Sequence, residues 1–95
     1  MKTISGKSAR RLVEREGAML CDARDPVSFR NGSLPGAKNY PIRLISTLLS
    51  VNKKTPLVFF GNSNDDTDMT MGAKYAEVLG FTNVYLLGAI TNWQR

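Results

Sequence analysis

The chain has 95 residues, which limits it to one small core, because a chain of this size buries only somewhat over ~60% of its unfolded surface. It contains one cysteine, Cys21, and no histidine, which excludes an internal disulfide, a Cys/His zinc cluster and a catalytic pair that uses histidine. No apolar run approaches the ~20 residues of a membrane span. Residues 1–6 contain no signal-peptide core, so we expect a cytoplasmic protein.

The net charge of +5 is unevenly distributed along the chain. Residues 1–54 carry eleven Lys and Arg against four Asp and Glu, whereas residues 55–95 carry two against four, giving +7 and −2. A basic half could attract nucleic acid or an acidic partner. However, its arginines fit the solvent face of a helix, and no aromatic residues alternate with them as a single-strand binding surface requires. We therefore expect neither nucleic acid nor a membrane as partner.

The first half of the chain predicts helices that alternate with a buried strand. Apolar residues recur at helical spacing within residues 7–16, with Ser5 as a possible N-cap. Residues 18–23 form a nearly continuous apolar run, which is typical of a strand buried on both faces of a parallel sheet. Asp25 and Pro26 have the residue types of an N-cap and a first helical position. A brief helical turn is therefore expected there, before a second helix over residues 42–50.

The second half continues the alternation. A strand over residues 57–60 leads into a polar loop over residues 61–66, followed by a helix that Gly80 ends. A strand over residues 84–87 and a short helix over residues 89–93 complete the chain. Strands that alternate with helices at these spacings predict an α/β fold. We expect one domain over residues 1–95, with a central, mainly parallel sheet flanked by helices.

Apolar positions within the helices predict which faces are buried. In the helix over residues 42–50, α-helical spacing places Ile42, Ile45 and Leu49 on one buried stripe. The helix after the polar loop is expected to bury most of its larger apolar side chains, and Trp93 is expected in the core. Three of these side chains lie on one edge of the helix and would form a contact patch if exposed. The apolar residues in question are Met69, Met71, Tyr75 and Val78, of which the last three form that edge.

Four segments, in order and with matching gaps, carry a family resemblance. They are residues 20–26 (LCDARDP), residues 32–39 (GSLPGAKN), residues 56–60 (PLVFF), and residues 79–85 (LGFTNVY) followed by Gly88 and Trp93. Through them the chain resembles the single-domain rhodanese-like sulfurtransferases over residues 4–93. It departs from the family at Ser33, where histidine is usual, and at Ala89, where a second glycine is usual.

The resemblance identifies a candidate site in the polar loop. In the family, the residue after the strand equivalent to 57–60 is a nucleophilic cysteine, seated in a loop whose N–H groups bind an anionic sulfur donor. Here that position is Gly61, on which no persulfide can form. The residues equivalent to the family's active loop are Gly61, Asn62, Ser63, Asn64, Asp65, Asp66 and Thr67.

The composition of this loop differs from that of an anion site. It lacks the family's arginines, is about two residues longer, and carries Asp65 and Asp66, with Asp68 shortly after. A carboxylate about 8 Å from a monoanion opposes its binding by roughly 2 kcal/mol at an effective dielectric of ~20. A helix N-terminus offers only ~0.3–1 kcal/mol per charge. The loop is therefore expected to repel thiosulfate or phosphate.

Two interpretations of the acidic residues remain open. Ser63, Asp65, Asp66 or Thr67 could cap the following helix, where acidic side chains also complement the helix dipole. A cation site is the alternative, because four residues match offsets 1, 3, 5 and 12 of an EF-hand loop. These residues are Asp66, Asp68, Thr70 and Glu77. Capping is the favoured interpretation, and we expect neither a metal nor a cofactor.

Cys21 and the two oppositely charged residues that follow it, Asp22 and Arg24, each have two interpretations. A cysteine within a buried strand behaves as a small apolar residue, although Cys21 could be a relocated catalytic thiol. Asp22 and Arg24 favour a structural ion pair over a substrate clamp. The leading hypothesis is a catalytically inactive rhodanese-like domain that acts as a binding or regulatory module, with an unidentified protein partner or a second copy. The alternative is a sulfurtransferase with residual activity through Cys21.

Overall fold

The computed structural model describes residues 1–94 and contains one five-stranded sheet in the order β1-β5-β4-β2-β3. All four strand pairings are parallel, which confirms the predicted α/β class. The long strands occupy the middle, and the two edge strands, which the sequence did not predict, have two residues each. The strands are β1 (Lys2–Thr3), β2 (Met19–Asp22), β3 (Lys38–Asn39), β4 (Leu57–Gly61) and β5 (Val84–Ala89).

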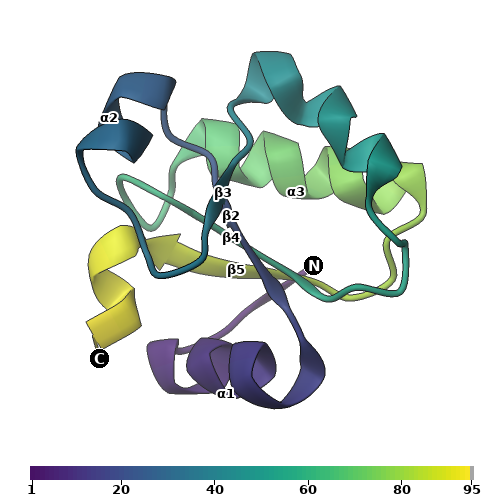
Figure 1. Ribbon diagram of the computed structural model, residues 1–95, viewed down its shortest axis with the longest axis horizontal. Coiled ribbons are helices and arrows are strands. Elements are labelled where there is room, and N and C mark those ends of the chain that lie inside the picture. Colours follow the sequence, from purple (N-terminus) through teal and green to yellow (C-terminus); the bar gives the residue numbers. More distant parts are fainter. Residues whose placement is uncertain (95) are drawn as a thin grey trace.

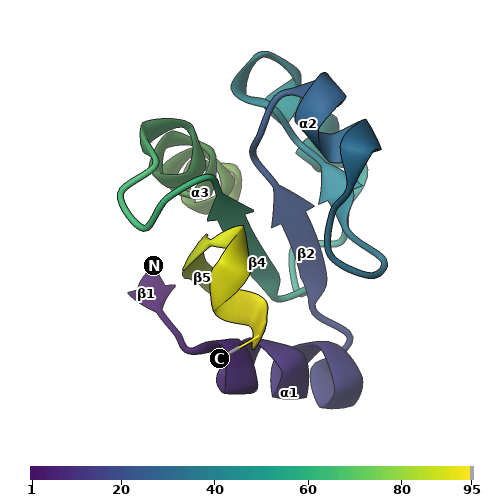
Figure 2. The ribbon, with the colours of Figure 1, turned by 90° about the vertical axis from the view of Figure 1, so that its left-hand side faces the viewer.

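Helices cover both faces of this sheet, as Figure 1 shows. The helices α1 and η2 lie on one face, and η1 and α3 lie on the other, with α2 beyond the carboxyl end of β2 (Figure 2). The helix bounds are α1 (Gly6–Glu16), α2 (Pro26–Asn31), η1 (Ile42–Ser50), α3 (Thr67–Leu79) and η2 (Ile90–Gln94). No helix within residues 1–94 is long and apolar enough to cross a bilayer.

The central strand β4 divides the core into two clusters. All five of its residues are buried, and successive side chains point to opposite faces. Phe59 therefore packs under η1 and α3, and Phe60 packs under α1 and η2. Burying each ring contributes about 1.5–3 kcal/mol to the stability of the fold. This burial fixes the carboxyl end of β4, where the polar loop begins.

Side-chain caps determine where two helices begin. The Ser5 hydroxyl accepts a hydrogen bond from the Ser8 N–H, and the Asp25 carboxylate accepts one from the Ser28 N–H. These bonds satisfy N–H groups that have no partner within their own helix. Both N-caps agree with the sequence predictions for α1 and α2.

The predicted buried stripe of residues 42–50 is wrong at its last position. Leu48 is fully buried, whereas Leu49 is 61% exposed. The segment is a 3₁₀-helix with three residues per turn, so positions three apart share a face. The stripe therefore comprises Ile42, Ile45 and Leu48.

The apolar residues of α3 are less buried than predicted. Met69 is fully buried, but Met71, Tyr75 and Val78 are exposed, Val78 to 83%. The sheet and η1 cover only one side of this helix, so the edge formed by these three side chains faces solvent. Trp93 is half-buried in η2 and packs against the second core cluster.

Candidate functional site

The polar loop leaves the carboxyl end of β4 and turns directly into α3 (Figure 2). Gly61 is the last residue of β4 and is buried, whereas Asp66 is half-buried and Thr67 is the first residue of α3. The residues between are exposed, and they comprise Asn62, Ser63, Asn64 and Asp65. All the predicted loop residues therefore lie at the edge of the sheet where ligands bind in open α/β folds.

The Asp66 carboxylate bonds to backbone N–H groups at both ends of the loop. Its Oδ1 accepts a hydrogen bond of 3.1 Å from the Met69 N–H, and its Oδ2 accepts one of 3.0 Å from the Asn62 N–H. Asp66 is the N-cap of α3, so the capping interpretation is confirmed for this residue. A carboxylate of the protein itself thus occupies N–H groups that an external anion would need.

The EF-hand-like spacing does not produce a cation site. Residues 67–79 form a continuous helix, and a rise of 1.5 Å per residue separates Asp68 from Glu77 by roughly 13 Å along its axis. Within residues 1–94, no group of three or more potential metal-binding side chains converges. The four acidic and hydroxyl residues therefore do not act as one ligand set.

Gly61 leaves room for the Asp66 side chain. A Cβ atom added at Gly61 would lie 2.5 Å from Asp66 Oδ2 and 2.7 Å from its Cγ, far inside van der Waals contact. The backbone of Gly61 is not in the left-handed region, so its torsion angles do not require glycine. The requirement comes from the close approach of the carboxylate. Any side chain at position 61 would have to displace Asp66 from its capping position.

A second contact ties the loop to the end of β5. Asn64 Oδ1 accepts hydrogen bonds from the Ala89 N–H at 3.1 Å and from Asn92 Nδ2 at 2.7 Å. Gly88 permits this approach, because a Cβ there would lie 2.6 Å from Asn64 Oδ1. The Asn64–Asn92 contact leaves no signal in the sequence, since the two residues are 28 positions apart and match no motif.

Asp22, the last residue of β2, and Arg24 form an ion pair in which no buried side-chain nitrogen or oxygen lacks a hydrogen-bond partner. Asp22 is fully buried, and its Oδ2 accepts a hydrogen bond of 2.8 Å from Arg24 Nη2 and one of 2.7 Å from the Ser33 hydroxyl. The hydrogen bond to Asp22 raises the pKa of Arg24. Arg24 Nη2 also donates to the Gly32 carbonyl, so the guanidinium holds the segment after α2 in place. These contacts support the structural interpretation of the pair.

Cys21 lies inside the sheet. Its side chain is fully buried, and burial raises the pKa of its thiol because a thiolate would lose its hydration there. A neutral, enclosed thiol cannot attack a sulfur donor from solvent. Its burial supports the structural interpretation of Cys21.

Comparison with known proteins identifies the family. A family model described as the rhodanese-like domain matches residues 5–95, and no curated protein matches the chain. Among solved structures, the human single-domain sulfurtransferase TSTD1 is 23% identical, with a TM-score of 0.79 over 97% of this chain and 94% of that one.

Two further structures have the same fold. The Saccharomyces cerevisiae single-domain sulfurtransferase RDL2 is 20% identical, with a TM-score of 0.75 over 98% of this chain and 88% of that one. The rhodanese-like domain of the Anabaena protein Alr3790 is 21% identical, with a TM-score of 0.80 over 97% of this chain and 72% of that one. At these identities the likeness shows the fold alone, whereas the family model covers nearly the whole chain. The chain therefore belongs to the rhodanese-like domain family.

Proposed function

We propose that residues 1–95 form a rhodanese-like domain that has lost sulfur transfer and acts as a binding or regulatory module. Its contact surface would be the loop surface, defined as residues 61–67, and its partner another protein or a second copy. The observation that carries this proposal is the position of the Asp66 carboxylate. It fills the space of a side chain at position 61 and bonds to the N–H groups of the loop.

Sulfur transfer requires a thiolate that a donor can reach, and this chain offers none at the surface. Gly61, which has no side chain, stands where the family resemblance places the nucleophile. The only thiol is that of Cys21, which is buried in β2 and has a raised pKa. A persulfide could therefore form only if the sheet opened.

The loop also disfavours the anionic donors used by the sulfurtransferases of the family. Asp66 occupies the N–H groups of Asn62 and Met69, and Asp65 adds a second carboxylate on the exposed side of the loop. Each carboxylate at about 8 Å opposes a monoanion by roughly 2 kcal/mol at an effective dielectric of ~20. The same charges suit a partner with basic side chains, and steer such a partner toward this edge of the sheet.

The alternative function is residual sulfur transfer through Cys21. It is favoured by the names of two structural neighbours, both of which are single-domain sulfurtransferases. It would require local opening of β2, a central strand that pairs on both sides. Central strands open with free energies near that of global unfolding. This alternative thus predicts at most very slow turnover.

Incubation with thiosulfate and cyanide separates the two functions. We expect no thiocyanate above the level of a Cys21→Ser control. We also expect no adduct of one sulfur atom on the intact protein after treatment with thiosulfate alone, whose outer sulfur would pass to a reactive thiolate with release of sulfite. Thiocyanate production that disappears in Cys21→Ser would overturn the inactive-module proposal. An adduct on the wild type that is absent from the variant would show that Cys21 accepts sulfur.

A further inference from the structure

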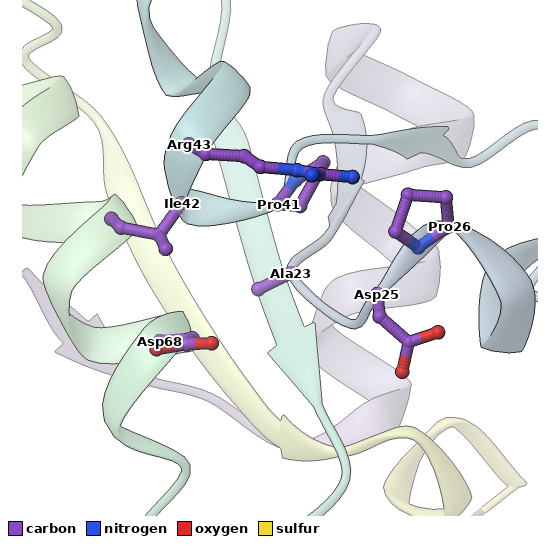
Figure 3. A pocket seen from close by; sticks show the side chains of 7 residues that line it. All are labelled: Ala23, Asp25, Pro26, Pro41, Ile42, Arg43 and Asp68. Carbon is purple, nitrogen blue, oxygen red and sulfur yellow. The ribbon is translucent and has the colours of Figure 1, made fainter.

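A separate hollow lies beside the loop, between α2, η1 and α3, at the carboxyl end of β2. Its volume is about 210 Å³, and Figure 3 shows the side chains around it. None of residues 61–67 lines it, so it is distinct from the loop surface. The lining residues are Ala23, Asp25, Pro26, Pro41, Ile42, Arg43 and Asp68.

Opposite charges face this hollow without pairing with each other. Arg43 extends from η1 on one side, while Asp25 and Asp68 lie on the opposite side (Figure 3). Within residues 1–94, neither Arg43 nor Asp68 forms a salt bridge or a side-chain hydrogen bond. Both carboxylate oxygens of Asp25 already accept hydrogen bonds, of 2.9 Å from the Ser28 N–H and 3.0 Å from the Ser28 hydroxyl. One free cation and one free anion therefore remain for a ligand.

The surface between these charges is apolar. Ala23 and Pro41 are buried, and Pro26 and Ile42 are half-buried, so methyl and ring carbons are exposed to the hollow rather than polar atoms. Contact with this surface favours a ligand with an aliphatic body. The volume corresponds to roughly seven water molecules at ~30 Å³ each, which suits a ligand smaller than a drug-sized molecule.

We propose that this hollow binds a small zwitterion with an aliphatic body, namely a free amino acid of about the size of leucine. Its carboxylate bonds to the Arg43 guanidinium, whose planar donors match a carboxylate in a bidentate arrangement. Its ammonium bonds to the Asp68 carboxylate, and its side chain covers Pro41 and Ile42. This site goes beyond the proposed function. It uses no atom of the loop surface, so it does not depend on whether the domain transfers sulfur.

A zwitterion is favoured over a peptide terminus because both free charges are then used at once. The C-terminus of a peptide offers only a carboxylate beside an aliphatic residue, and the N-terminus offers only an ammonium. N-acetyl-leucine reproduces the C-terminus, and leucinamide reproduces the N-terminus. Comparison of the three compounds therefore separates a free amino acid from either peptide end.

The test is a titration of ¹⁵N-labelled protein with L-leucine, followed by amide chemical shifts. We expect saturable shifts around Ala23, Ile42 and Asp68, with a Kd on the order of 1 mM. Leucinamide and N-acetyl-leucine are each expected to bind about three- to tenfold more weakly. Absence of saturable shifts at leucine concentrations up to about 50 times this Kd would overturn the proposal. Equal or tighter binding of either derivative would also overturn it.

Matched variants assign the two charges. Arg43→Gln should weaken leucine binding about three- to tenfold and remove the preference for leucine over leucinamide. Asp68→Asn should do the same for the preference over N-acetyl-leucine. The controls are Arg30→Gln and Asp65→Asn, which change exposed charges outside the hollow. Spectra of the free variants confirm folding. Unchanged leucine affinity in both Arg43→Gln and Asp68→Asn would refute the assignment.

Discussion

Substitution of Gly61 by alanine tests whether the Asp66 carboxylate controls this position. In a strand, alanine is ordinarily preferred over glycine by about 0.5–1 kcal/mol. Gly61 ends β4 with backbone angles that any residue adopts, so alanine would stabilise the fold if space allowed. The added Cβ would instead lie 2.5 Å from Asp66 Oδ2, so the carboxylate must move.

The cost of moving Asp66 follows from its contacts. Loss of the N-cap bond to Met69 costs about 1 kcal/mol, and loss of the bond to the Asn62 N–H costs about 1 kcal/mol more. After subtraction of the alanine preference, Gly61→Ala should lower the free energy of unfolding by about 1–1.5 kcal/mol. In an Asp66→Gly background the obstacle is absent. The same substitution should then raise stability by about 0.5–1 kcal/mol.

Urea denaturation followed by circular dichroism measures this change of sign. The four proteins of the cycle give a coupling energy of about 2 kcal/mol between positions 61 and 66. An Asp65→Gly background is the matched control, because Asp65 bonds to Ser63 and does not approach Gly61. In that background Gly61→Ala should remain destabilising. A stabilising effect of Gly61→Ala in the wild-type chain would refute the steric argument.

Three further predictions concern buried and capping groups. Because burial raises the pKa of the Cys21 thiol, the stability of the fold should be full below the unfolded pKa of about 8.5 and should fall above it by up to about 1.4 kcal/mol per pH unit. Cys21→Ala should lack this excess loss in urea denaturation at pH 10. An equal loss in the variant would contradict the prediction. Hydrogen bonds from Ser28 lower the pKa of Asp25, so its contribution is present above about pH 3.9 and lost as pH falls through its folded pKa. The lower Tm of Asp25→Ala at pH 7 should converge with that of wild type near pH 2, and a constant difference would count against this cap. Asn64→Ala should cost about 1 kcal/mol and speed hydrogen exchange at the Ala89 N–H, whereas unchanged exchange would mean that this bond does not form in solution.

Features with a strong local signal could be predicted from the sequence. Ser5 and Asp25 are short polar residues just before helical segments, and both act as N-caps. The apolar runs of β2 and β4 predict strands buried on both faces, because only such strands can do without polar alternation. The four family segments then placed Gly61 at the start of the loop after β4.

Features that depend on tertiary contacts could not be predicted in this way. The stripe of η1 depends on whether the helix has three or 3.6 residues per turn, and apolar spacing alone does not distinguish Leu48 from Leu49 as its last member. The edge strands β1 and β3 are too short to show periodicity. The hollow lined by Arg43 and Asp68 joins two helices that are distant in sequence, and each charge alone resembles an ordinary solvent-exposed residue.

The absence of a side chain at position 61 and the acidic character of the loop are one structural feature rather than two. Asp66 can cap α3 and bond to the Asn62 N–H only if position 61 has no Cβ, and a side chain at 61 fits only if Asp66 leaves. Introducing a thiol by Gly61→Cys would therefore break the loop contacts and place the new sulfur beside a displaced carboxylate, which raises a thiol pKa and repels anionic donors. A nucleophilic side chain at position 61 requires a change at position 66 as well, so Gly61→Cys alone should give weak or no sulfur transfer.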